Sequence, residues 1–528
     1  MQSEKLYIGI DAGTQSVKVA VFDEHTNCLC SYTKPTTLTY PNPGWVDMDI
    51  DEFLNITIDC IKLCVDDVKG QGYSANAIKS VLCDGVICGI CGVDKEGNAI
   101  TPYINYLDSR TQDDVNYINS LNLEIFAKET GNPEAKCLFP AMFARWFIKN
   151  SQAFNERGVK FVHNAPYIGM HLAGLKGDDA YIDWGTMSGW GLGYKVEKKE
   201  WSDEQLQILD IDKKFMPRIL KPWDVVGTVC KEMAKRTGLS TDTKICAGAG
   251  DTMQSMLGAG IFKANQGVDV AGTCAMFCVS TKGIIPKLSQ KGTGLIFNSG
   301  TLPDTYFYWG FIRTGGLALR WFKDSVCQKG DDPAYYQNLS KEAAKIGIGS
   351  NGVIFLPYLT GGTDFAKNAC GAFLNLELDT DQFVMWRAVL EAIGFDYMEI
   401  ADVYKDAGVD LTRITVAEGG SRDHLWNQIK ADMLDAVVTR YKVSGGAVRT
   451  NSVFAAYAAG DVDDLLSKLE SLLEKDAEYE PNKENSAQYR KLFTLKRELV
   501  QSDMPSSFTK LAKIREECSK FDNNKTSD

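Results

Sequence analysis

The sequence predicts an α/β protein made of two similar domains that face each other across a cleft. Apolar runs rich in β-branched residues alternate with helical patterns along the chain, which indicates sheets covered by helices. The motif Ala-Gly-Thr occurs between strand-like runs at residues 12–14 and again at 271–273, and this suggests a duplicated domain. A chain of 528 residues is also too long for one hydrophobic core and fits two domains.

The first motif lies in a β-hairpin predicted for residues 6–22. Gly13 lets backbone N–H groups approach an anion closely, and Thr14 and Gln15 add short donors. Asp11 ends the first strand and could hold a cation or its water shell. These are the groups of a phosphate site for a magnesium nucleotide, although an ordinary hairpin turn can contain the same residues.

The second motif lies in a similar hairpin predicted for residues 268–281. Its turn contains Gly272 and Thr273. Two such turns in opposite halves of the chain would grip one polyphosphate from both sides.

Composition excludes several classes of protein. The chain has 44% hydrophobic and 24% charged residues, as folded globular proteins do. Its net charge of −12, without a cluster of Lys and Arg, argues against nucleic acid as a partner. No apolar run of 18 residues and no cleavable signal are found, so we expect a cytoplasmic protein without membrane contact. The 15 scattered cysteines fit reduced thiols.

After the first hairpin, the sequence predicts a strand within residues 27–40 and then a loop, 41–47, that carries Trp45. A helix is expected to begin after Asp49 and to end near Gly70, because apolar residues recur there at helical spacing.

Apolar strands follow within residues 80–106, and the chain then becomes charged at Asp108 and Arg110. Ligands of open α/β sheets bind at strand ends. Cys88 and Cys91 have the spacing of a metal motif, but strand positions three apart point to opposite faces, so both are expected in the core.

Residues 181–194 are unusually rich in glycine and aromatic residues. Near a cleft, such a stretch could wall a sugar by stacking, or it could form a tightly packed hairpin. Both interpretations remain open.

A candidate catalytic carboxylate follows in residues 245–260, where a Gly-rich strand end delivers Asp251 to the start of a helix. A lone carboxylate at such a place is often only a helix cap. Its position just before the second Ala-Gly-Thr motif favours the interpretation that Asp251 faces the terminal phosphate.

The second half continues with a strand at 352–358, a long helix at 382–407 and a strand at 414–418. That strand ends at Gly419 and Gly420. Glycines before a helix would let a base or ribose lie against backbone, which predicts an adenosine site. Asn427, in the helix that follows, is assigned to the same site. A closely packed helix at 452–460, a helix at 483–500 and a polar tail are expected last.

With these motifs in order, the chain resembles the FGGY family of carbohydrate kinases, in the hexokinase and actin superfamily of duplicated ribonuclease-H-like domains. The resemblance covers residues 6–498 and implies domains at 1–247 and 248–480, with a helix and tail at 481–528. Its most specific pieces are residues 8–16, 43–46, 106–110, 201–203, 248–258, 271–273, 355–358 and 418–426.

The resemblance implies phosphorylation of a sugar or polyol hydroxyl by ATP, with xylulose-like ketopentoses as the default acceptor and another polyol, ketose or sugar-derived signal as the alternative. It implies that Asp251 is the catalytic base and that Asp11 and Asp251 lie near Mg²⁺. It also implies that Thr14 and Thr273 hold phosphates. A homodimer is left open.

The acceptor pocket is where the chain departs from the family. Val86, Ile87 and Cys88 stand where xylulose kinases have Gln-Met-His, which removes hydrogen-bonding side chains that select a sugar. These three residues, with Trp45, Asp108, Arg110 and Asp251, are predicted to contact the substrate. An ATPase switch and a catalytically weakened sugar sensor are the alternative functions. The acceptor pocket argues against the first and Asp251 against the second.

Overall fold

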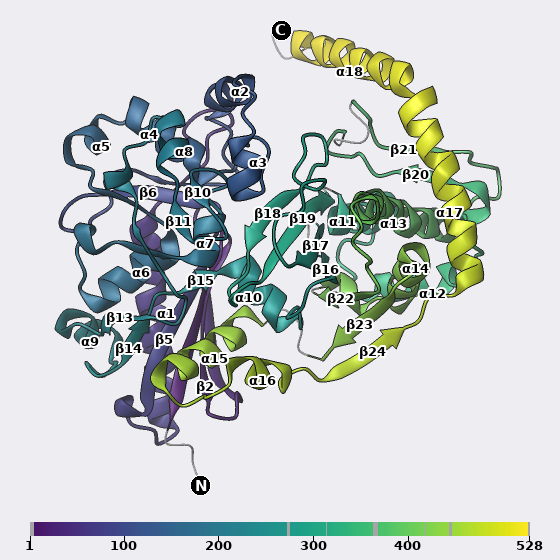
Figure 1. The fold of residues 1–528 in the computed structure, drawn as a ribbon. Helices are drawn as coiled ribbons and strands as arrows, with labels where there is room; N and C mark the ends of the chain where they lie inside the picture. Colours follow the sequence, from purple (N-terminus) through teal and green to yellow (C-terminus); the bar gives the residue numbers. More distant parts are fainter. Residues whose placement is uncertain are drawn as a thin grey trace.

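The computed structural model describes residues 5–271, 275–312, 314–362, 368–417, 419–442 and 446–525. Two halves lie side by side, each built around a seven-stranded mixed sheet (Figure 1). The predicted two-domain α/β fold is confirmed.

The two sheets share one plan. In each, an antiparallel hairpin is followed by a third antiparallel strand, and the first hairpin strand pairs in parallel with a later strand that has a further parallel neighbour. The strands of the first sheet are β13 (Val225–Thr228), β14 (Lys244–Cys246), β5 (Ile78–Gly85), β1 (Leu6–Ala12), β2 (Ser16–Asp23) and β3 (Cys28–Pro35), with β15 (Ala249–Gly250) beside β5. Those of the second are β18 (Ile296–Ser299), β19 (Tyr306–Ile312), β17 (Ala275–Thr281), β16 (Gln266–Ala271), β22 (Arg413–Ala417), β23 (Val437–Tyr441) and β24 (Lys475–Tyr479). The shared plan supports duplication.

Smaller sheets extend both halves. They are formed by β4 (Asp47–Met48), β7 (Tyr103–Asn105), β6 (Gly89–Val93) and β8 (Lys160–Val162); by β9 (Tyr181–Asp183) and β12 (Arg218–Leu220); by β10 (Tyr194–Lys195) and β11 (Glu200–Trp201); and by β20 (Ile354–Leu356) and β21 (Ala372–Leu374).

Helices cover the sheets. In the first half they are α1 (Ile50–Gly70), α2 (Gln112–Ser120), α3 (Ile125–Thr130), α4 (Pro140–Asn150), α5 (Gln152–Arg157), α6 (Asn164–Ala173), α7 (Trp184–Ser188), α8 (Asp203–Ile208) and α9 (Lys231–Thr237). The later ones are α10 (Asp251–Gly258), α11 (Gly315–Trp321), α12 (Tyr335–Ala343), α13 (Gln382–Asp406), α14 (His424–Leu434), α15 (Ala447–Ala459), α16 (Leu465–Glu470), α17 (Lys483–Glu498) and α18 (Pro505–Lys525). As predicted, α1 begins after Asp49, whose carboxylate caps it by accepting from the Asp51 N–H.

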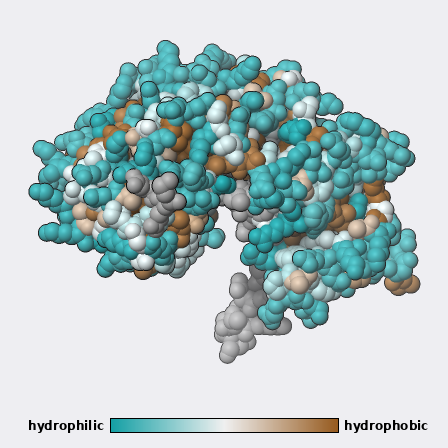
Figure 2. Space-filling model, turned by 90° about the horizontal axis from the view of Figure 1, so that it is seen from below, coloured by the Kyte–Doolittle hydropathy of each residue, from teal (hydrophilic) through white to brown (hydrophobic). Residues whose placement is uncertain are grey.

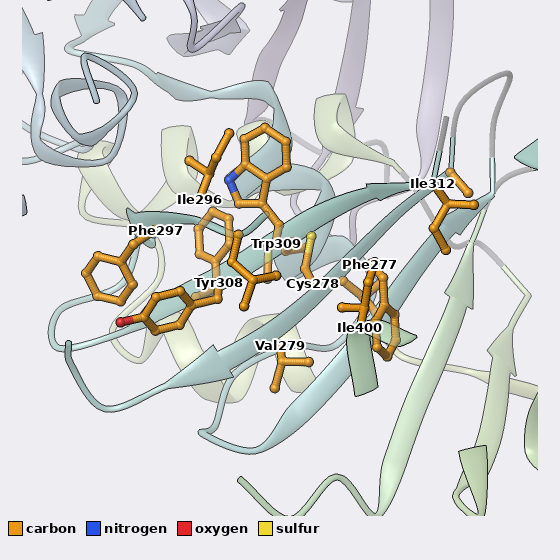
Figure 3. Close-up of a cluster of buried hydrophobic side chains, with 14 of the residues drawn as sticks. Phe277, Cys278, Val279, Ile296, Phe297, Tyr308, Trp309, Ile312 and Ile400 are labelled. Carbon is orange, nitrogen blue, oxygen red and sulfur yellow. The ribbon is translucent and has the colours of Figure 1, made fainter. Parts of the chain in front are cut away.

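The core of the second half lies between its sheet and α13, where aromatic and aliphatic side chains interlock (Figure 3). The rings of Phe277 on β17 and Tyr397 on α13 meet edge to face at 5.4 Å. Nearby, the buried carboxylate of Asp269 pairs with the Lys430 ammonium of α14 at 2.5 Å. Breaking such a buried pair leaves an uncompensated charge, so the pair fixes α14 on β16.

Helix α15 belongs to the later part of the sequence but packs against β1 and β5 of the first sheet (Figure 1). The contact is close at Gly9, where an added Cβ would lie 1.9 Å from the Val448 carbonyl oxygen of α15. Only glycine allows this approach of backbone to backbone, so Gly9 holds a helix from the second half of the sequence onto the first sheet.

Two segments differ from the expectations. Residues 181–194 form β9 and the short helix α7 with buried rings such as Trp190 and Tyr194, so they are neither a hairpin nor an exposed aromatic wall. The expected polar tail forms the helix α18, which projects from the body (Figure 1). No helix within the described part of the chain is long and apolar enough to span a membrane.

Candidate active site

Three carboxylates meet at the ends of adjacent parallel strands. Asp11 on β1 stands opposite Asp84 on β5 in the strand register, and Asp84 stands opposite Ala249 on β15. Asp251 follows β15 directly and begins α10. Because β5 lies between the other two strands, the sheet itself places all three acids at one edge. Asp84 was not among the predicted site residues, although it lies at the end of an apolar strand before a glycine.

The electrostatics of this cluster favour protonated acids. Burial, followed by the charge of Asp11, raises the pKa of Asp251 to about 7, although hydrogen bonds from the Thr252 N–H (2.6 Å) and hydroxyl (3.2 Å) oppose the shift. Burial, with the charges of Asp11 and Asp251, also raises the pKa of Asp84 well above its usual value. The site therefore has an excess of negative charge that a bound cation would relieve.

The residues fit Mg²⁺, which prefers carboxylate oxygens and keeps several water and phosphate ligands. Within the described residues, no three His, Cys, Asp or Glu side chains are placed to enclose a metal ion. A Mg²⁺ ion at Asp11 and Asp251 would therefore share its coordination sphere with phosphates and water.

The turn predicted to bind phosphate in the first half joins β1 and β2. The Gly13 N–H donates to the Ser16 carbonyl at 3.0 Å, and a Cβ at Gly13 would lie 3.6 Å from the Asp11 carboxylate. Thr14 is nearly buried and its carbonyl accepts from the Thr36 hydroxyl at 2.5 Å. Gln15 is exposed at the tip. The turn thus lies directly beside one acid of the cluster.

Gly272 and Thr273, expected in the second phosphate turn, lie outside the described residues. The strands on either side are in place, since β16 ends at Ala271, which pairs with Ala275 on β17.

The predicted adenosine residues lie at the end of β22, beside the second hairpin. A Cβ at Gly420 would lie 2.6 Å from the Cβ of Ala271, whereas a Cβ at Gly419 would have no atom of the described residues within 4 Å. Asn427 is fully buried and donates to the Ser421 carbonyl at 2.7 Å. Among the described residues, Gly419 thus borders free space, while Asn427 stabilises the turn beneath it.

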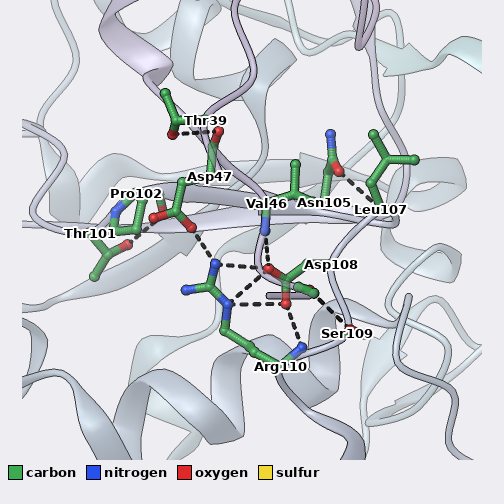
Figure 4. Close-up of polar contacts among 11 residues, drawn as sticks. Thr39, Val46, Asp47, Thr101, Pro102, Asn105, Leu107, Asp108, Ser109 and Arg110 are labelled. Carbon is green, nitrogen blue, oxygen red and sulfur yellow. Dashed lines mark hydrogen bonds and ion pairs between the residues drawn. The ribbon is translucent and has the colours of Figure 1, made fainter. Parts of the chain in front are cut away.

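The charged strand end is neutralised internally (Figure 4). The Arg110 guanidinium binds the carboxylates of Asp47 and Asp108, and Asp108 also accepts from the Val46 N–H at 2.6 Å. The guanidinium carbon lies 4.2 Å from the ring centroid of Trp45. Arg110 and Asp108 are almost fully buried, so they stiffen the loop around Trp45.

The three residues that depart from the family pattern join β5 to β6, just after Asp84. Val86, Ile87 and Cys88 are all buried, and a Cβ at Gly250 would lie 2.3 Å from Ile87, next to Asp251. Tyr106 and Leu107 are about half exposed and form a more accessible part of this region.

His163, which lies in no phosphate-turn motif, is buried. Burial lowers the pKa of His163 to about 3, so the ring is neutral near pH 7 and a poor base. This agrees with the choice of a carboxylate.

The two halves leave a deep notch between them (Figure 2). A cavity of about 160 Å³ also lies between the halves, lined by Lys136 and Leu138 from the first and by residues such as Phe311 and Thr314 from the second. Thr314 follows β19, whose Ile312 pairs with Ala275 at the start of β17.

Replacing Asp84 with Asn is expected to stabilise the ligand-free protein at pH 8. Below about pH 4, the pKa of an unfolded Asp, the carboxyl is protonated in both states and does not lower stability. As the pH rises through the folded pKa, the unfolded state ionises more readily than the native state, so the free energy of unfolding falls. Asn does not ionise, so the variant avoids this loss of stability at high pH. We expect an increase in melting temperature of about 2 °C at pH 8 that shrinks as the pH falls toward 5. Thermal melts with EDTA across this range test it, and a variant that is less stable at pH 8 would contradict it.

Models of one protein family match most of the chain. The model of the FGGY family of carbohydrate kinases, N-terminal domain, matches residues 6–258, and that of the C-terminal domain matches residues 268–459. A xylulose kinase of Staphylococcus epidermidis is 24% identical over 500 residues, covering 93% of this chain and 96% of its own.

Two solved structures share the fold. The gluconate kinase of Lactobacillus acidophilus superimposes with a TM-score of 0.83 at 23% identity, covering 96% of this chain and 99% of its own. The glycerol kinase of Plasmodium falciparum with ADP gives 0.84 at 20% identity, covering 94% and 98%.

Proposed function

Because the chain belongs to the FGGY family of carbohydrate kinases, we propose that it transfers the terminal phosphoryl group of ATP to a hydroxyl of a neutral ketopentose such as xylulose. The observation that carries this proposal is the position of Asp251, at a strand end beside Asp11 and the first phosphate turn. Its raised pKa, about 7, suits a group that must accept a proton near neutral pH.

Phosphoryl transfer needs the terminal phosphate held in line with the attacking hydroxyl and its charge spread over a metal ion and backbone donors. Asp11 and Asp251 would hold Mg²⁺, which supplies charge neutralisation when bound. The N–H groups around Gly13 and Thr14 would bind phosphate oxygens, with Thr273 opposite. Asp251 would orient the sugar hydroxyl and take its proton.

Replacing Thr14 with Val is expected to weaken ATP binding by about 1 to 3 kcal/mol, because it removes a hydroxyl from a charged acceptor. Calorimetric titration with Mg²⁺ and a non-hydrolysable ATP analogue measures the change. Thr33→Val, on an exposed position of the same sheet, is the matched control. Equal affinity in the Thr14 variant and the parent would place the phosphates elsewhere.

The charges around the acceptor favour a neutral substrate over a sugar acid. Among the residues predicted to contact the substrate, Arg110 is the only cation, and Asp47 and Asp108 already neutralise it. The charge of Asp11 lies beside Asp251, and Asp251 adds negative charge when it is ionised. A carboxylate-bearing substrate would meet repulsion and find no free cation in this set of residues.

We therefore expect xylulose or another neutral ketopentose to be phosphorylated with a kcat/KM on the order of 100-fold above that of gluconate, as an unpaired charge in a partly buried site costs roughly 3 kcal/mol. A coupled assay of ADP release with xylulose, other ketopentoses, glycerol and gluconate tests this. The Asp251→Asn variant, assayed in parallel, corrects for contaminating kinases. Gluconate as the preferred acceptor would overturn the proposed substrate class and leave the family assignment intact.

A further inference from the structure

The buried side-chain amide of Asn451 forms hydrogen bonds with all three segments that carry the acids. Asn451 lies on α15 and is fully buried. Its Nδ2 donates to the Ile10 carbonyl at 2.8 Å and to the Asp84 carboxylate at 2.7 Å, and its Oδ1 accepts from the Gln254 amide at 2.7 Å. Since both the carbonyl and the carboxylate are acceptors, the orientation of the amide is fixed by its partners.

One partner of Asn451, Asp84, is itself an acid of the cluster, and each of the other two lies close to another acid in the sequence. Ile10 immediately precedes Asp11 on β1. Gln254 lies three residues after Asp251, on the same side of α10. Asn451 is therefore bonded to β1, β5 and α10 at once, where a single side chain can set the spacing of the three carboxylates.

We propose that Asn451 is a positioning residue for phosphoryl transfer, which holds Asp11, Asp84 and Asp251 at their working separation. In the sequence α15 lies between β23 and β24 of the second sheet, but it packs against the first sheet. The helix that sets this spacing is therefore connected to both halves. The inference rests on the proposed role of Asp251 and goes beyond it, because Asn451 touches neither phosphate nor sugar in that scheme.

The chain supplies a matched control on the same interface. One helical turn farther along α15, the Ala455 carbonyl accepts from the buried Ser80 hydroxyl of β5 at 2.6 Å. Ser80 lies on the same face of β5 as Asp84, four residues away. Ser80→Ala thus removes a buried hydrogen bond to α15 without loosening the acids.

Two variants test the proposal. Asn451→Ala removes all three hydrogen bonds. Gln254→Met breaks only the bond to α10, and it preserves volume while removing a buried Oε1 that has no partner, so this variant is expected to fold normally.

We expect kcat at saturating substrates to fall about tenfold or more in both variants, because a displacement of reacting groups by about 1 Å can cost roughly 100-fold. KM for ATP and sugar should change less than about threefold. Ser80→Ala should keep kcat within about twofold, even if its melting temperature falls. The variant with both substitutions should have a kcat no lower than that of Asn451→Ala, since Gln254 and Asn451 belong to the same hydrogen-bond network.

Crystal structures of the variants give a second measurement that needs no substrate. Movement of the Asp84 or Asp251 carboxyl away from Asp11 in the Asn451 and Gln254 variants, but not in Ser80→Ala, is the expected result. Unmoved carboxyls, or a kcat loss equal to that of Ser80→Ala, would overturn the positioning role. A parent that phosphorylates no neutral sugar would overturn the proposed substrate class alone, because the crystal structures would still decide the role of Asn451.

Discussion

Asp251→Asn is expected to lower turnover by a factor of about 100 or more, the usual contribution of a positioned general base. The amide keeps the shape of the carboxyl group and its acceptor oxygen for the Thr252 N–H and hydroxyl, so the start of α10 should remain intact. It cannot take the proton of the attacking hydroxyl. Affinities for ATP and sugar should stay near those of the parent, and the loss should appear in kcat.

The matched control is Asp49→Asn, which changes the N-cap of α1 from one good capping residue to another, away from the acid cluster. Steady-state kinetics at saturating ATP and sugar compare the two variants with the parent. Turnover of Asp251→Asn within about tenfold of the parent would assign the base to another residue.

The pH dependence of kcat/KM for Mg-ATP is expected to show a midpoint near 7 and to fall on the acidic side. Burial and the charge of Asp11 raise the pKa of Asp251 to about 7, and only the ionised carboxylate can accept a proton. Well below that pH the active fraction drops tenfold per unit, which gives roughly a 50-fold loss between pH 7 and pH 5. A surface carboxylate with a pKa near 4 would keep full activity over this range.

The profile of kcat should have its midpoint at lower pH than that of kcat/KM, because a nearby cation favours the ionised carboxylate in the loaded enzyme. Melting curves at pH 5 establish that the protein remains folded there. A profile that is flat from pH 8 to pH 5 would show that no group with the pKa of Asp251 acts as the base.

Local patterns in the sequence were sufficient for the architecture. The strand runs on either side of Gly13 and of Gly272 form the predicted hairpin strands, because alternating apolar residues depend on neighbours in the chain. The same holds for α1 and α13, whose helical spacing is local. The place of Asp251, at a strand end before a helix, could likewise be read from residues 245–260.

The chemistry of the site was decided by tertiary structure. Asp84 joins Asp11 only because β5 pairs in parallel with β1 in one particular register, and pairing between distant strands is not encoded in either strand alone. The pKa of Asp251 depends on burial and on the charge of Asp11, 240 positions away in the chain, and neither can be read from the residues around Asp251. Arg110, expected at a ligand site, is neutralised by Asp108 and by Asp47 of the distant strand β4.

Asn451 is the clearest case, since it reaches the Ile10 carbonyl across 441 positions of the chain. An asparagine in a helix pattern carries no sign of its partners. The sequence by itself determined which elements form and where an acid could meet a phosphate. Only the packing of α15 on the first sheet decided which side chains hold that acid in place, because hydrogen bonds between distant segments exist only once both are folded together.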